Sequence, residues 1–256
     1  MKPVGRSWKR RLSPQYRWDQ VAVATVQQTM RGWFERWGLP ERIRVDNGNP
    51  WSSRTDLPPA LPLWWLGLGI EPVWNPPRRP TKNPFVERCN GLIDTWGEPE
   101  RCPDFASWEP TLARLCQVQR EQYPTAKGCS RSAAHPELRQ VRRSYQAQTE
   151  AQQWELGRVL QWLSRGRWPR RVSKIGQIHL YGQPYRVGRQ YARETVWVQL
   201  DPETVEWVVC NQAGEELIRH AAQQLTAERI CQLQVAHPRP LSHQDKQRNL
   251  ATQAPT

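Results

Sequence analysis

The sequence predicts a mixed α/β protein whose last third is all-β. Two patterns in the spacing of apolar residues support this prediction. Between residues 19 and 38 they recur every three or four positions, as on one face of a helix, and helical and extended segments then alternate to about residue 105. From about residue 175 they alternate every second position, which is the period of a strand. The 256 residues are therefore expected to form more than one module.

The first half of the chain is expected to follow the order helix, strand, helix, strand. The first helix is predicted over 19–38, with Asp19 as its N-cap and Gly38 as its stop. The short strand RIRV follows and ends at Asp46. A second helix is expected within LPPALPLWWLGLG, and a strand at 70–74 contains a proline that favours an edge position.

A proline-rich loop and a third helix complete this first module, which is predicted to span 1–105. The stretch NPPRRPTKNP carries four prolines and three basic residues, as an exposed loop would. Asn83 is the expected N-cap of the third helix, which places Glu87 in or just after the first turn. The module is therefore an α/β core with an acidic residue after a strand and another at the start of a helix.

The rest of the chain is predicted to contain a helical connector, a small all-β module and a tail. Helices are expected at 106–123 and 137–163 within a connector at 106–170, followed by SRGRWPRRVSK as a basic linker. Five short strands at 171–222 predict a small barrel or sandwich. The polar stretch 237–256 is expected to be a disordered tail.

The charge of the chain predicts a polyanionic partner. The formal net charge is +13 and the isoelectric point is about 10.0, so nucleic acid is the expected partner. No apolar stretch approaches the roughly 20 residues that a membrane span needs, so we expect a cytoplasmic protein without a membrane partner. The six cysteines form no C-x-x-C pair and are expected to be free thiols.

Asp46 and Glu87 are the candidate chemical residues. Two carboxylates could share Mg²⁺, which prefers oxygen ligands, and two such ions can assist an in-line phosphoryl transfer. The alternative is structural: Asp-Asn-Gly is a common turn, and a Glu near a helix N-terminus compensates the helix dipole. The candidate nucleic-acid-binding residues are Asn47, Arg78, Arg79, Lys82, Arg88, Arg165, Arg167, Arg170, Arg171 and Lys174.

The segments RWGLPERIRVDNGNPW and NPPRRPTKNPFVERCNGLIDTWGEPERC resemble the transposases and retroviral-type integrases with an Asp-Asp-Glu catalytic core, of the bacterial insertion-sequence type. The resemblance covers about residues 20–105. It implies a ribonuclease H-like core in which Asp46 and Glu87 bind Mg²⁺ or Mn²⁺ for DNA strand transfer. The 171–220 segment is similar to the small SH3-like barrel that follows this core in bacterial members. The sequence does not decide whether the chain forms a homo-oligomer on DNA.

The front of the chain departs from this family. In this family the first catalytic aspartate lies on the first of three strands that come before the first helix. Here only eighteen residues precede Asp19, which is too few for three strands. We therefore expect an N-terminally truncated core, a polynucleotidyl transferase by family that is inactive alone. One alternative is a recombinase whose first aspartate comes from a chain or upstream region that this sequence omits. The other is a nucleic-acid- or partner-binding protein that kept the scaffold without the chemistry.

Overall fold

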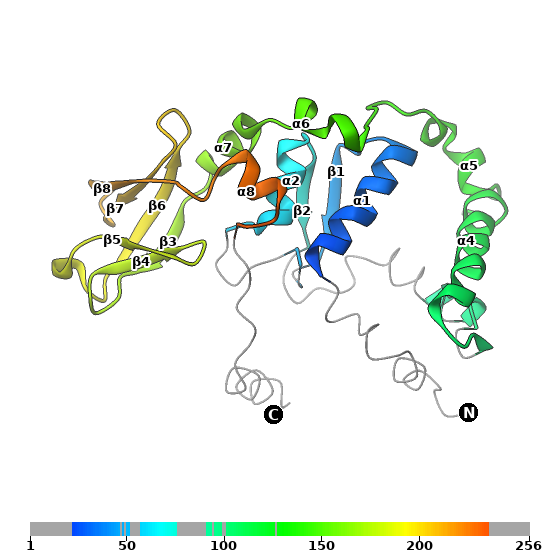
Figure 1. Ribbon diagram of the computed structural model, residues 1–256, viewed down its shortest axis with the longest axis horizontal. Helices are drawn as coiled ribbons and strands as arrows, with labels where there is room; N and C mark the ends of the chain where they lie inside the picture. Colours follow the sequence, from blue (N-terminus) through cyan, green and yellow to red (C-terminus); the bar gives the residue numbers. More distant parts are fainter. Residues whose placement is uncertain are drawn as a thin grey trace. The chain divides into compact units, whose positions relative to one another are not determined.

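The computed structural model describes residues 22–46, 48, 50–51, 57–75, 91–93, 95–98, 101–125 and 127–235. The described chain is a mixed α/β protein, as the spacing of apolar residues predicts (Figure 1). It divides into two compact units, and each unit is formed by two separate stretches of the chain. Unit 1 holds the described residues up to 46 and from 70 to 153, and unit 2 holds residue 48 to residue 69 together with those from 154 onward.

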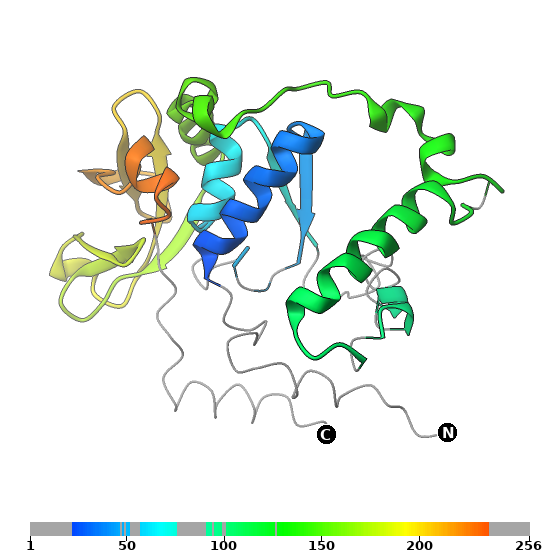
Figure 2. The same cartoon turned by 45° about the vertical axis from the view of Figure 1, so that its right-hand side comes forward.

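Unit 1 begins with α1 (Val23–Trp37), which follows Ala22 at the N-cap position. The helix therefore starts four residues after Asp19, so the predicted start is wrong. Asp19 itself lies outside the described residues. Both ribbon views show α1 lying alongside β1 (Arg42–Val45) (Figures 1 and 2), and the buried side chains of α1 are Gln27, Met30 and Phe34.

A parallel pair of strands lies in unit 1. β1 pairs with β2 (Glu71–Trp74) in the register Arg42↔Glu71 to Val45↔Trp74. The two strands predicted from RIRV and from residues 70–74 are thus confirmed. Between them the chain passes through α2 (Ala60–Gly67), the second predicted helix, so the local order is strand, helix, parallel strand.

The remainder of unit 1 is helical and irregular. The predicted helix at 106–123 is confirmed as α4 (Phe105–Glu121), where the Asp104 carboxylate accepts a hydrogen bond from the Ser107 amide at 2.8 Å and so caps the first turn. The continuous helix predicted at 137–163 is wrong. The short helix α5 (Arg131–Ala134) lies before that stretch. The stretch itself contains four short helices: η6 (Pro136–Arg139), η7 (Ala147–Thr149), α6 (Glu150–Gln153) and α7 (Leu156–Ser164).

Unit 2 is built around α2, which is apolar on every side. All eight residues of α2 are buried, and α7 and α8 (Ala227–Cys231) both pack against it. The C-terminal carbonyls of α2 are satisfied by later residues. The Trp154 indole donates to the Trp64 carbonyl at 3.0 Å, and the Glu155 amide and the Arg158 guanidinium donate to the Gly67 carbonyl at 3.0 and 3.1 Å.

The strands of unit 2 form two antiparallel sheets. The four-stranded sheet has the order β3-β6-β7-β8, and its strands are β3 (Trp168–Arg171), β6 (Thr195–Asp201), β7 (Glu206–Cys210) and β8 (Glu216–Ala221). β4 (Gln177–Leu180) and β5 (Gln183–Arg186) form a separate hairpin. The described strands thus confirm an all-β region, but as two sheets without a closed barrel.

The turn between β4 and β5 contains only two residues, Tyr181 and Gly182. Both have positive φ, 49° and 76°, as a type I′ turn requires. Glycine adopts this conformation freely, whereas tyrosine does so rarely. The Tyr181 ring is buried and its hydroxyl donates to the Pro58 carbonyl at 3.1 Å, so tertiary contacts hold the strained residue in place.

The basic linker predicted at 164–174 needs correction. Trp168–Arg171 forms β3, an edge strand that pairs with β6 from Trp168↔Val198 to Arg171↔Thr195. The helical connector predicted at 106–170 therefore ends inside the four-stranded sheet. The predicted disordered tail at 237–256 lies outside the described residues.

None of the described helices combines the length and the apolar character needed to cross a membrane. None of the five described cysteines forms a disulfide, in agreement with the prediction, and Cys89 lies outside the described residues.

Candidate functional site

Asp46 lies immediately after β1 and its side chain is exposed. β1 and β2 run parallel (Figure 1). Val45 pairs with Trp74, so Asp46 and Asn75 follow the two strands at the same end of the sheet. The Asn75 amide donates to the Val45 carbonyl at 2.9 Å, which extends the ladder to this end. In α/β sheets the carboxyl ends of parallel strands are the usual place for ligand-binding side chains.

Asn75 is a neighbour of Asp46 that the sequence did not reveal. It is one of the few buried polar residues in the described part of the chain, with 8% of its surface exposed. Its place beside Asp46 depends on the parallel register of β1 and β2, which no local pattern specifies. The only local signal was the position of Asn75 directly after the predicted strand at 70–74.

Most of the partners predicted for Asp46 lie outside the described residues. They are Glu87 and Asn47, together with the basic candidates of the loop and the third helix, Arg78, Arg79, Lys82 and Arg88. The predicted approach of Asp46 and Glu87 therefore stays a prediction. Within the described residues no three His, Cys, Asp or Glu side chains gather as a metal site would need.

The basic candidates of unit 2 lie on and around β3. Arg165 follows α7 directly, Arg167 precedes β3, Arg171 ends β3, and Lys174 lies three residues beyond it. All four side chains are exposed. Exposed positive charges thus lie at both ends of β3, which is an edge strand of the four-stranded sheet.

Arg170 differs from these four residues. It alternates with the exposed Pro169 and Arg171 and lies on the same side of β3 as the buried Trp168, so it is only partly exposed. Its guanidinium donates to the Pro169 carbonyl at 2.7 Å. Arg170 is therefore poorly placed to contact a phosphate, although the sequence predicts it as a nucleic-acid-binding residue.

An aromatic ring supports the basic edge. The Arg167 guanidinium lies over the Trp197 ring, 5.6 Å from its centroid, and Trp197 is paired with Pro169 in the register of β3 and β6. Such cation–π contacts restrain an arginine side chain without removing its charge. Arg167 is therefore held at the surface with its charge available.

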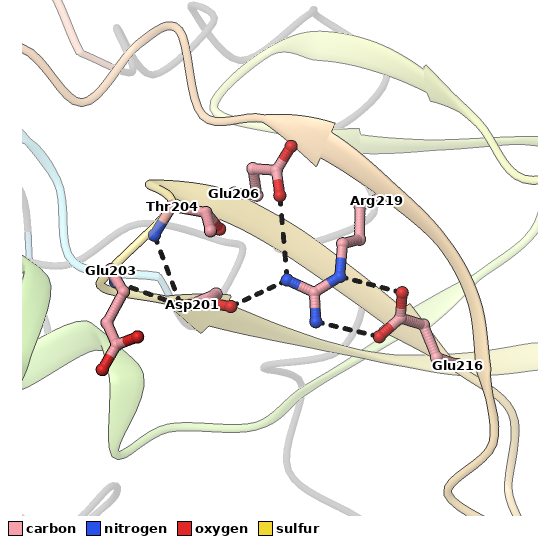
Figure 3. A network of polar contacts seen from close by, with 6 residues as sticks. All are labelled: Asp201, Glu203, Thr204, Glu206, Glu216 and Arg219. Carbon is pink, nitrogen blue, oxygen red and sulfur yellow. Dashed lines mark hydrogen bonds and ion pairs between the residues drawn. The ribbon is translucent and has the colours of Figure 1, made fainter.

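The other edge of the same sheet is acidic. From residue 155 to residue 193 the chain has nine Lys or Arg residues and one Glu, whereas from 194 to 235 it has seven acidic residues and two arginines. Arg219 on β8 is surrounded by carboxylates (Figure 3). It pairs with Asp201 at 2.7 Å, with Glu216 at 2.8 and 3.0 Å, and with Glu206 at 3.7 Å.

This network shifts the titration of its members. The hydrogen bond from Arg219 is the main cause that lowers the pKa of Asp201, and backbone amides add to it. The carboxylates of Glu216 and Asp201 raise the pKa of Arg219 above its ordinary value. The acidic network therefore stays ionised at neutral pH. An anionic ligand would be attracted to the basic β3 edge and repelled from the β7–β8 edge.

A buried polar cluster in unit 1 was also not predicted. The Arg31 guanidinium donates to both carboxylate oxygens of Glu150, at 3.0 and 2.7 Å, and the Tyr145 hydroxyl donates to the same carboxylate. Tyr145 packs edge-on against Phe34 with ring centroids 5.8 Å apart. The cluster of Arg31, Tyr145 and Glu150 attaches the 143–150 segment to α1, which is a structural rather than a chemical role.

Two tryptophans of α1 are exposed although their spacing predicts a buried face. Trp33 and Trp37 continue the apolar stripe of the helix, but 57% and 47% of their surfaces are exposed. Their exposure is a finding of the structure, because the sequence pattern does not say how wide the covered part of the stripe is.

No protein-family model matches the chain.

Proposed function

We propose that the chain is a DNA strand-transfer protein that resembles the Asp-Asp-Glu transposases and integrases and has a ribonuclease H-like core. The observation that supports this proposal is the position of Asp46: an exposed carboxylate that follows a parallel strand, at the end of the sheet where Asn75 also lies. A turn-forming aspartate would need no parallel partner strand. A metal-binding aspartate gains a rigid support from it.

In this proposal Asp46 and Glu87 are the second and third acids of the catalytic set. They would hold Mg²⁺ or Mn²⁺, which bind carboxylate oxygens together with the phosphates of a substrate. The metal would activate the attacking oxygen and stabilise the leaving one. The first acid of the set is not assigned to a residue.

The β3 edge is the proposed DNA-backbone contact of unit 2, within an SH3-like arrangement of its strands. Arg165, Arg167, Arg171 and Lys174 are exposed and have no carboxylate paired with them in the described part of the chain. Phosphate contacts of this kind give affinity without sequence preference. In this proposal the acids and the basic edge each contact DNA.

The test of the acid site measures how Mn²⁺ changes DNA affinity and whether DNA is nicked. Mn²⁺ is expected to strengthen DNA binding by the native chain, because bound metal neutralises carboxylates that otherwise repel phosphate. Asp46→Asn and Glu87→Gln should abolish this gain. Glu41→Gln is the matched control, because Glu41 is an exposed acid at the opposite end of β1 and should leave the gain intact.

The outcomes separate the two enzyme states. Mn²⁺-dependent nicking that disappears in Asp46→Asn would show a complete catalytic set. Metal-strengthened binding without nicking would show a metal site that lacks the first acid. Equal affinity with and without Mn²⁺ would contradict the acid site altogether.

The second candidate is a DNA-binding protein without catalysis, which the exposed basic side chains on and around β3 favour by themselves. Replacing Arg165, Arg167, Arg171 and Lys174 by Gln should lower the slope of log affinity against log salt by about 0.9 for each phosphate that these side chains neutralise. Arg101→Gln is the control, because Arg101 is exposed but paired with Glu98 at 2.7 Å. A slope that stays unchanged in the fourfold variant would show that β3 does not bind DNA.

A further inference from the structure

The exposed face of α1 carries two large aromatic rings one helical turn apart. Trp33 is 57% exposed and Trp37 is 47% exposed, which makes them the two most exposed aromatic side chains among the large apolar residues at the described surface. Exposing such rings forgoes the stabilisation that burial would give, which is about 1.5–3 kcal/mol for a large apolar side chain. An exposed pair of this kind is typical of a contact surface.

Two arginines lie against the second ring. The Arg36 guanidinium lies 4.8 Å from the centroid of Trp37, and the Arg120 guanidinium, which α4 supplies, lies 5.1 Å from it. None of the described arginines lies over Trp33. Trp37 therefore orients two cations, while Trp33 leaves its ring open. We call Trp33, Arg36, Trp37 and Arg120 the tryptophan platform.

The platform is positively charged. Arg36 forms no ion pair with a described carboxylate, and Arg120 has only a long contact of 3.5 Å with Glu121. The neighbouring carboxylate of Glu35 forms no described ion pair with either arginine; it accepts a hydrogen bond from the Ala147 backbone amide at 3.1 Å. An open ring beside two cations is complementary to a ligand with a flat apolar face and negative charges.

We propose that the tryptophan platform binds single-stranded DNA: an unpaired base stacks on Trp33, and Arg36 and Arg120 contact the phosphates beside it. This inference rests on the proposed function, because it assumes that the chain acts on DNA. It adds a candidate site on α1 of unit 1, made of residues other than those assigned to the acids and to the β3 edge. Base stacking on aromatic side chains beside a cationic groove is the general mode of single-strand binding.

The spacing of the rings favours a single strand over a duplex. Four residues of helix rise about 6 Å between Trp33 and Trp37, whereas stacked bases are about 3.4 Å apart. Bases within a duplex also hide their faces against each other, so a ring can stack only on a base that has left the stack. The platform therefore fits a strand whose bases are already separated.

The experiment measures the affinity of the full chain for oligo(dT) and for a blunt duplex of equal length, in EDTA. Trp33→Ala should weaken oligo(dT) binding roughly 5- to 150-fold, the range for losing one base–aromatic stack. Duplex binding should change less than about twofold. Trp33→Phe should restore most of the single-strand affinity, because the aromatic face is retained.

The arginines have a separate readout. Arg36→Gln together with Arg120→Gln should lower the salt slope for oligo(dT) by about 1.4, which is about 0.7 for each phosphate neutralised on a single strand. Trp96→Ala is the matched control. Trp96 is exposed to 41%, but its ring packs against Tyr123 rather than against an arginine, so single-strand affinity should not change.

Three results would overturn the inference. The first is an unchanged oligo(dT) affinity in Trp33→Ala, and the second is an equal loss for oligo(dT) and duplex. The third is a change in oligomeric state, measured by sedimentation, without a change in single-strand affinity, which would make the platform a contact between copies of the chain. If the native chain binds neither DNA, the proposed function fails as well. If it binds duplex normally and Trp33→Ala has no effect, only this inference fails.

Discussion

The two units differ in where they place their tryptophans. In unit 2, Trp64, Trp65 and Trp207 are completely buried, together with most of the leucines and valines of the sheet and of α2. In unit 1, Trp33, Trp37 and Trp96 are exposed, whereas Trp108 is buried. Among the described residues, four of the five exposed large apolar side chains belong to unit 1, and the fifth, Ile175, belongs to unit 2.

The units also differ in what holds them together. Unit 2 relies on apolar packing around α2 and on a continuous four-stranded ladder. Unit 1 has a two-stranded sheet and relies on specific polar contacts, above all the cluster of Arg31, Tyr145 and Glu150. The difference indicates a division of labour: unit 2 is stabilised by burial, whereas unit 1 leaves part of its apolar surface for binding.

The largest expected effect comes from removing a buried ring of unit 2. Trp207 has no exposed surface and contacts the rings of Trp168 and Tyr181, with centroids 6.1 and 6.2 Å away. Trp207→Ala should lower the free energy of unfolding by about 3–5 kcal/mol, because it removes buried area and leaves a cavity. Chemical denaturation followed by circular dichroism measures this loss.

The same substitution in unit 1 is the control. Trp33→Ala should change the free energy of unfolding by less than about 0.5 kcal/mol, as is usual for exposed positions. A loss comparable to that of Trp207→Ala would break the comparison, because it would mean that Trp33 is covered in solution.

A smaller effect is expected from the polar cluster of unit 1. Glu150→Gln removes the charge that balances Arg31 and should cost about 2–3 kcal/mol, somewhat less than for a fully buried pair, because 23% of the Arg31 side chain is exposed. Glu71→Gln is a close control. It breaks the Arg42–Glu71 pair, which has the same 2.7 Å distance but exposed partners, and should cost at most about 1 kcal/mol.

If both substitutions cost the same in thermal or chemical denaturation, burial would not distinguish the two pairs. The view that polar contacts stabilise unit 1 would then fail. Equal small costs would point to a cluster that only positions the 143–150 segment.

Alkaline pH should destabilise both units. Burial is the main cause that raises the pKa of Tyr145, and the bond to Glu150 adds to it; burial likewise raises the pKa of Tyr181. The unfolded chain ionises its tyrosines near pH 10, so stability is complete below that pH and falls above it. The slope should be about 1.4 kcal/mol per pH unit for each such tyrosine.

Two variants assign this slope to the units. Tyr145→Phe and Tyr181→Phe should each remove one tyrosine's share of the decrease above about pH 10, measured by urea denaturation at a series of pH values. A slope that neither variant changes would show that the two hydroxyls ionise in the folded protein as easily as in the unfolded chain.

The elements that the sequence predicted well are those whose signals are local. β4–β8 follow from the two-residue period and from turn residues such as Gly182, and α4 follows from its helical period. The N-cap of α4, Asp104, was not predicted. Asp46 was correctly placed after a strand because that signal is also local. These patterns need no knowledge of distant residues.

The elements that were missed depend on distant partners. WPRR contains proline and two arginines and lacks a strand pattern, yet β6 provides a ladder for it. The polar 137–163 segment has helical composition, but docking of Tyr145 and Glu150 on α1 breaks it into short pieces. Likewise, the place of Asn75 beside Asp46 follows from strand register, and the exposure of Trp33 depends on what the rest of unit 1 covers.

α2 belongs to unit 2, although it lies in the sequence between two strands of unit 1, and this has a consequence for biosynthesis. α2 leaves the ribosome between β1 and β2, but its partners in unit 2 come much later, as the bond between Trp154 and Trp64 shows across 90 positions. At about 5–20 residues per second, translation of that interval takes roughly 5–20 s. Throughout this time an eight-residue helix that is apolar on every side has none of its later partners. The nascent chain should therefore depend on a chaperone during this interval, and a pause in translation before residue 154 should increase aggregation.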